Sequence, residues 1–221
     1  MRKIQFQNGH YYHIYNRGVD KRDIFIDGKD YLRFLRTMRE LNDLEPVESL
    51  YRQDQLRRQN DKEAKPLRLK NNRSGLASLI AYCLNSNHYH FLVEQLVNDG
   101  ISKFMHKLST GYTRYFNEKY NRSGSLFQGT FKAVEIKSDY QLYYVSAYIN
   151  ANSEIHKITK AENHKYSSYL DYLGKRQGTL VNKNIVLDDF QNIKDYKKYT
   201  EDIIKNSQKI KEEIKRCLIE I

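Results

Sequence analysis

Two histidines, His88 and His90, stand two positions apart in the segment HYHFLVE and are the first candidates for chemistry. The segment reads as a β-strand, in which alternate side chains point to the same face. The two imidazoles are therefore expected on one face, with Tyr89, Phe91 and Val93 on the other. Together they could hold a divalent metal ion. Taken alone, however, a His-x-His pair is a weak signal, because it also describes two exposed polar positions of a half-buried sheet.

A second component of the candidate site lies in a helix that is predicted from Ser138 to about Ser153. Its tyrosines are Tyr140, Tyr143, Tyr144 and Tyr148. Because residues four apart are neighbours on a helix, each tyrosine can be judged by the residue at +4. Tyr148 is the one followed there by a carboxamide, Asn152. One helical turn can thus present a hydroxyl nucleophile and a third metal ligand, although periodicity by itself equally allows Tyr148 to pack in the core.

This set of groups suits the cleavage of a phosphodiester. A divalent metal bound by two imidazoles and an amide oxygen keeps open positions and can polarise a phosphate. A phenol, with a pKa of about 10, is a poor nucleophile without such help, but it leaves readily when the step is reversed. A phosphotyrosine intermediate would conserve the energy of the bond and allow rejoining.

The rest of the sequence predicts the elements that must position these groups. Strands and helices alternate with turn signals in the order strand, helix, strand, strand, helix, strand, helix. The predicted elements are a strand at 10–17, a helix at 30–44, a hairpin of 76–84 and 88–95 in the middle of the sheet, a helix at 99–120, a strand at 126–136 and the helix at 138–153. This order predicts an α+β, ferredoxin-like or RNA-recognition-like fold, an antiparallel sheet with helices packed mainly on one face.

We expect one domain at 1–174, followed by a mostly helical C-terminal extension at 175–221. Residues 45–75 contain both prolines and few apolar side chains, so they are read as a solvated insertion. In the extension, a helix is predicted over 196–219, and it could pack on the body or on a second subunit.

The charge balance points to a polyanionic partner. The chain has 38 Lys and Arg against 27 Asp and Glu, a net charge of +11, which favours nucleic acid through phosphate neutralisation. An anionic membrane surface would fit the same charge, but no stretch approaches the apolar length of a spanning helix. The two cysteines, Cys83 and Cys217, form neither a disulfide framework nor a metal cluster. We therefore predict a cytoplasmic, nucleoid-associated protein with no membrane partner.

Five segments, in order and spacing, resemble the single-tyrosine HUH transposases, and within them the REP-associated tyrosine transposases and their insertion-sequence relatives. The segments are YYHIYNRGVDKRDIF (11–25), NHYHFLVE (87–94), ISKFMHKLSTGYTRYFNEKYNRSGSLFQGTFKA (101–133), VSAYINAN (145–152) and YSSYLDYLG (166–174). They cover nearly all of residues 10–174 apart from 45–75.

The resemblance implies a small nuclease that cuts single-stranded DNA near a hairpin with Mg²⁺ or Mn²⁺ and leaves a 5′-phosphotyrosine. By position it makes His88 and His90 metal ligands, Tyr148 the nucleophile and Asn152 the third ligand. Where the family usually has His-Leu between the tyrosine and the asparagine, this chain has Asn-Ala, so Tyr144 remains the alternative nucleophile. The resemblance also leaves a homodimer open.

Candidate DNA contacts are the basic and polar residues of the matching segments, Asn16, Arg17, Gln128 and Lys132. Two other functions compete with an active strand transferase. One is a domesticated relative that binds hairpin nucleic acid without cutting it, and the other is a replication-initiation or relaxase nuclease, which fits the segments less well.

Overall fold

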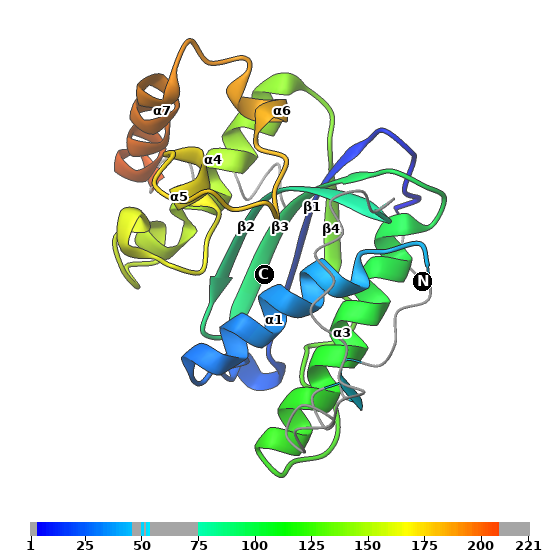
Figure 1. Cartoon of the computed structure of the whole chain (residues 1–221). Helices are drawn as coiled ribbons and strands as arrows, with labels where there is room; N and C mark the ends of the chain where they lie inside the picture. The colour runs from blue at the N-terminus through cyan, green and yellow to red at the C-terminus, as the bar shows by residue number, and fades with distance from the viewer. Residues whose placement is uncertain (1–3, 46–49, 51, 54–74, 208–221) are drawn as a thin grey trace.

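A computed structural model describes residues 4–45, 50, 52–53 and 75–207 of the chain. Its centre is a four-stranded antiparallel sheet in the order β2-β3-β1-β4 (Figure 1). The strands are β1 (Tyr11–Arg17), β2 (Ala77–Asn85), β3 (His88–Gln95) and β4 (Lys132–Ile136). The expected α+β class, with an antiparallel sheet, helices and a helical C-terminal part, is confirmed.

Helices cover both faces of this sheet. The helices α1 (Gly28–Leu41) and α3 (Gly100–Lys119) contact each other and pack on one face of the sheet (Figure 1). They share a hydrophobic cluster with Tyr89, Phe91 and Val93 of β3. The helix α4 (Asp139–Ile155) packs on the opposite face, against β2 and β3. Helices were expected mainly on one face. The position of α4 on the other face was not predicted, because the apolar residues of α4 do not tell which face of the sheet they cover.

Short elements complete the chain. They are the 3-10 turns η1 (Val19–Lys21) and η2 (Ala161–Asn163) and the helices α5 (Tyr169–Tyr172), α6 (Asn184–Leu187) and α7 (Ile193–Lys205). The helix predicted over 196–219 thus begins three residues earlier, and its part beyond residue 207 lies outside the described residues, as does nearly all of the predicted insertion at 45–75.

Two expectations about strands need correction. The hairpin of β2 and β3 forms, but it does not lie in the middle of the sheet, since β2 is an edge strand. The strand predicted at 126–136 is shortened to β4, because Gly129 has a φ of +68° and turns the chain before Lys132. Turn geometry therefore overrides the alternating pattern of residues 126–131.

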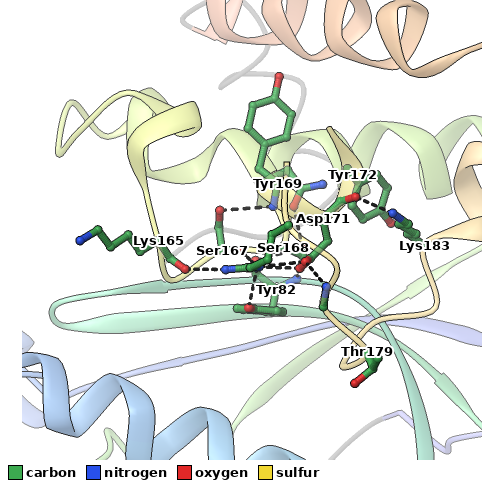
Figure 2. Close-up of polar contacts among 12 residues, drawn as sticks. Tyr82, Lys165, Ser167, Ser168, Tyr169, Asp171, Tyr172, Thr179 and Lys183 are labelled. Atoms are coloured by element: carbon green, nitrogen blue, oxygen red, sulfur yellow. Dashed lines mark hydrogen bonds and ion pairs between the residues drawn. The ribbon is translucent and has the colours of Figure 1, made fainter. Parts of the chain in front are cut away.

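The outer edge of β2, which pairs with no other strand of the sheet, is covered by the chain segment between η2 and α6. The Ser168 amide donates to the Tyr82 carbonyl at 2.9 Å, and the Tyr82 amide donates to Ser168 Oγ at 2.9 Å (Figure 2). Farther along, the Asn182 amide donates to the Leu79 carbonyl of β2 at 2.7 Å. These bonds satisfy an edge that would otherwise be free to pair with another chain.

The described part of the C-terminal helix, α7, packs on α4 and therefore on the body of the protein. No helix within the described ranges is long and apolar enough to cross a membrane.

Candidate active site

The histidine pair lies where strand alternation places it. His88 and His90 are on the face of β3 that α4 covers, and their ring centroids are 5.2 Å apart at right angles. Their neighbours Tyr89, Phe91 and Val93 are fully buried on the other face. The strand is thereby fixed by its apolar side, and the two imidazoles are held with it.

The environment of His88 fixes its tautomer. Asn87 Oδ1 lies 2.6 Å from His88 Nδ1 and can only accept, so Nδ1 carries the proton. The Nε2 atom is left with its lone pair, and it lies 2.9 Å from Asn85 Nδ2 and 3.4 Å from Asn152 Oδ1. The side chain of His88 thus directs a basic nitrogen at the two amides.

His90 is held by a third histidine. Its Nδ1 lies 2.9 Å from Nε2 of His13 on β1, and the two rings stack with centroids 5.1 Å apart. This contact leaves Nε2 of His90 as the atom available to a ligand. The ring of Tyr15 also stacks on His90, at 5.7 Å.

All three imidazoles favour the neutral form. Burial lowers the pKa of His13 to about 3. Burial, helped by the nearby His156, lowers the pKa of His88 to about 4. For His90, burial and then the neighbouring His13 and His88 lower the pKa well below its usual value. Neutral imidazole is the form that binds a metal ion.

Tyr148 and Asn152 lie on the face of α4 that meets the histidines. The Tyr148 ring meets His90 edge-on at 6.0 Å and His13 edge-on at 6.4 Å between centroids. Tyr148 is 2 % exposed. The alternative, Tyr144, stacks instead toward Tyr140, which is 70 % exposed near the start of the helix. Of these two tyrosines, it is Tyr148 whose ring meets His90.

The opposite side of α4 is fixed by its own polar contacts. Asn150 Nδ2 donates to the Tyr196 hydroxyl of α7 at 2.8 Å, and its Oδ1 accepts from Ser168 Oγ at 2.6 Å. The hydroxyl of Ser146, one turn earlier, is 3.2 Å from that of Tyr196. Positions 146 and 150 thus anchor the helix outward, while positions 148 and 152 face the histidines.

The residues present fit a divalent metal. Asn152 is fully buried, and its Nδ2 has no hydrogen-bond partner in the described part of the chain, whereas its Oδ1 points to His88 and Asn85. An amide oriented through its oxygen beside a basic nitrogen is a suitable ligand pair for a hard cation. No group of three or more His, Cys, Asp or Glu residues arranged for a metal occurs among the described residues.

The candidate DNA contacts lie at the same end of the sheet. Strand register pairs Arg17 of β1 with His88, and its Nε donates to Gln128 Oε1. Gln128 and Lys132 are exposed. Asn16 is different, since it is buried and its amide donates to the Gly129 carbonyl at 3.2 Å. Arg17 is thus the candidate contact paired with a histidine of the site, Gln128 is bonded to Arg17, and Asn16 holds the adjoining loop.

Several neighbours of the site were not singled out from the sequence, among them His13, Asn85 and Asn87. A signal existed for Asn85, because a two-residue hairpin turn places it directly opposite His88. Asn87 immediately precedes His88 in the sequence. For His13 there was no such signal, since the contact with His90 depends on the register between β1 and β3.

The family model described as "Transposase IS200 like" matches residues 47–152. No curated protein matches the sequence. One similar solved structure, "Structure of the REP associates tyrosine transposase bound to a REP hairpin", has a TM-score of 0.49 and 12 % identity, with 79 % of this chain and 85 % of that one covered.

A second similar structure is tRNA(His) guanylyltransferase from Saccharomyces cerevisiae. It has a TM-score of 0.36 and 7 % identity, with 90 % of this chain and 74 % of that one covered. The family match is the more informative result, because its range includes the histidine pair, Tyr148 and Asn152. Over residues 47–152, this chain is similar to the family of IS200-like transposases.

Proposed function

We propose that this protein cleaves and rejoins single-stranded, hairpin-associated DNA through a 5′-phosphotyrosine on Tyr148, with a divalent metal held by His88, His90 and Asn152. One observation carries the proposal. Tyr148 and Asn152, one turn apart on α4, face the histidine pair of β3, with Asn152 Oδ1 3.4 Å from His88 Nε2 and the Tyr148 ring against His90.

In the cleavage step, the Tyr148 oxygen forms a bond to phosphorus as the bond from phosphorus to the 3′ oxygen breaks. The phenol loses its proton and the 3′ oxygen gains one, so a 5′-phosphotyrosine and a free 3′ hydroxyl result. A bound Mg²⁺ or Mn²⁺ supplies charge stabilisation at the phosphate. Reversal with a different 3′ hydroxyl transfers the strand.

The protein's own groups prepare this step. Asn87 holds the tautomer of His88, and His13 contacts the Nδ1 atom of His90, so the two Nε2 atoms are available to the metal. Arg17 pairs with His88 in the β1–β3 register and would place a positive charge beside a DNA phosphate bound at the site. Because Tyr148 is 2 % exposed, strand binding must uncover it before attack.

The test is formation of a covalent adduct. The protein is incubated with single-stranded hairpin DNA and Mn²⁺ and analysed on a denaturing gel, with Tyr148→Phe and Tyr144→Phe as matched variants. We expect an adduct with the wild type and with Tyr144→Phe, and none with Tyr148→Phe. An adduct that persists in Tyr148→Phe overturns the assignment of the nucleophile.

The alternative is a domesticated protein that binds hairpin nucleic acid without cutting it. Hairpin binding with no adduct for any substrate or metal would support that function. The presence of both histidines, Tyr148 and Asn152 favours chemistry, because a protein that only binds has no physical need for all four.

A further inference from the structure

Asn85, the last residue of β2, lies inside the candidate metal site. It is fully buried and stands opposite His88 in the β2–β3 register. Its Nδ2 atom donates to Asn152 Oδ1 at 2.6 Å and to His88 Nε2 at 2.9 Å. A single amide nitrogen therefore bridges the two atoms that are proposed as metal ligands.

The Asn85 amide group does for these two acceptors what a cation would do. Asn152 Oδ1 and His88 Nε2 are both lone-pair donors, and they lie only 3.4 Å apart. With its two N–H bonds, the Asn85 amide satisfies one lone pair on each. Two buried acceptors facing each other without a proton or cation between them would be costly. The amide thus stabilises the site in the absence of metal.

The other end of the Asn85 amide is weakly held. Its Oδ1 accepts from Cys83 Sγ at 3.8 Å, and a thiol is a weak donor. Turning the amide by half a turn would place Oδ1 where Nδ2 now lies and direct the NH₂ group at a sulfur, which is a weak acceptor. Little is lost at this end, so the orientation of the amide depends on what lies between His88 and Asn152.

We propose that Asn85 is a further metal ligand, which turns its amide to present Oδ1 when the cation replaces its NH₂ group between His88 and Asn152. The inference rests on the proposed metal-dependent function and deepens it. The resulting donor set has two imidazoles and two amide oxygens. Added oxygen ligands favour hard cations such as Mg²⁺ and Mn²⁺ over the softer Zn²⁺.

The first test measures Mn²⁺ binding to the full chain by electron paramagnetic resonance, without DNA. In Asn85→Ala the affinity should fall by about tenfold or more, the scale on which even supporting residues of metal sites act. In Asn85→Asp it should be retained or increased, because a carboxylate offers the same oxygen with a charge and has no NH₂ group to displace.

The control is Asn42→Ala. Asn42 is a partly buried asparagine whose side-chain amide holds the start of β2. It accepts from the amides of Leu76 and Ala77 at 3.0 Å each and donates to the Ala77 carbonyl. It lies at the opposite end of β2 from Asn85. We expect Asn42→Ala to lower the stability while leaving Mn²⁺ affinity unchanged, which separates a lost ligand from a damaged fold.

A second measurement uses the wild-type protein and does not depend on the folding of any variant. With asparagine labelled by ¹⁵N, the side-chain NH₂ signals of Asn85 and Asn152 should both shift when diamagnetic Mg²⁺ is added. The Asn85 pair should shift the more, since its group leaves the acceptors it now contacts.

The outcomes distinguish this inference from the proposed function. If Mn²⁺ binding is lost in His88→Ala but is unchanged or tighter in Asn85→Ala, Asn85 is not a ligand, while the metal-dependent function stands. If Asn85→Ala weakens binding and Asn85→Asp restores it but no DNA adduct forms, the ligand is correct and the strand-transfer function is not. Absence of Mn²⁺ binding in the wild type overturns both.

Discussion

The side-chain amide of Asn150 donates a 2.8 Å hydrogen bond to the hydroxyl of Tyr196, and both residues are fully buried between α4 and α7. The contact ties the C-terminal part of the chain to the helix that carries Tyr148. The helix α4 has apolar residues on several sides, which alone would not fix its rotation about its axis. Ser146 and Asn150 fix it, because both contact the Tyr196 hydroxyl of α7.

Removal of the Tyr196 hydroxyl should therefore destabilise the protein. In Tyr196→Phe the ring stays, but the Nδ2 atom of Asn150 loses its buried acceptor, which costs about 1–3 kcal/mol in the free energy of unfolding. Urea denaturation measures the loss. Tyr199→Phe, on the same helix but only half-buried, is the control and should change the stability much less. Equal effects of the two variants would argue against the role of the hydroxyl.

Replacing each of two buried asparagines on α4 by alanine should affect different properties, metal binding in one case and stability in the other. Asn152→Ala is expected to weaken Mn²⁺ binding and to abolish the adduct on DNA, because its Oδ1 is a proposed ligand. Asn150→Ala is expected to lower stability and to leave Mn²⁺ affinity within a few-fold of the wild type. Calorimetric Mn²⁺ titration together with urea denaturation gives both quantities. If Asn150→Ala lost the metal and Asn152→Ala retained it, the orientation assigned to α4 would be wrong.

The buried histidines should make the folded state sensitive to acid. The pKa is lowered to about 3 in His13 and to about 4 in His88, whereas the unfolded chain titrates near 6.5. Below that value the unfolded state binds more protons, so stability falls as the pH drops from 6.5 toward 4, by about 1.4 kcal/mol per pH unit for each histidine.

Urea denaturation at pH 7, 6 and 5 measures this dependence. In His13→Gln the pH dependence should be less steep by the contribution of one histidine. An unchanged slope would mean that His13 is not held neutral in the folded state.

The four candidate DNA contacts should separate into two groups. Loss of the exposed charge in Lys132→Ala should weaken binding to single-stranded hairpin DNA and reduce the slope of log affinity against log salt by about one. Asn16→Ala should instead reduce stability, because Asn16 is buried and holds Gly129. Fluorescence anisotropy at several salt concentrations measures the slope, with the exposed Lys198→Ala of α7 as the control. A salt slope unaltered in Lys132→Ala would remove that residue from the interface.

The sequence by itself determined the order of the elements and the residues that belong together within one element. Alternation along β3 put His88 and His90 on one face, and a spacing of four put Asn152 one turn after Tyr148. Both relations follow from local backbone geometry, which is the same wherever the element lies. The capping residue Ser138 likewise predicted the start of α4, at Asp139.

Relations between elements were decided by the tertiary structure. One such relation is the covering of the second face of the sheet by α4. Another is the contact of His13 with His90, which are 77 positions apart, and a third is the hydrogen bond from Asn150 to Tyr196, which are 46 positions apart. Such contacts depend on strand register, on the rotation of a helix about its axis and on the packing of α7. These are settled by the burial of side chains from several elements at once, and no local pattern encodes them. Asn85 lies between the two cases: the hairpin places it opposite His88, but only the approach of Asn152 from α4 turns it into a bridge inside the site.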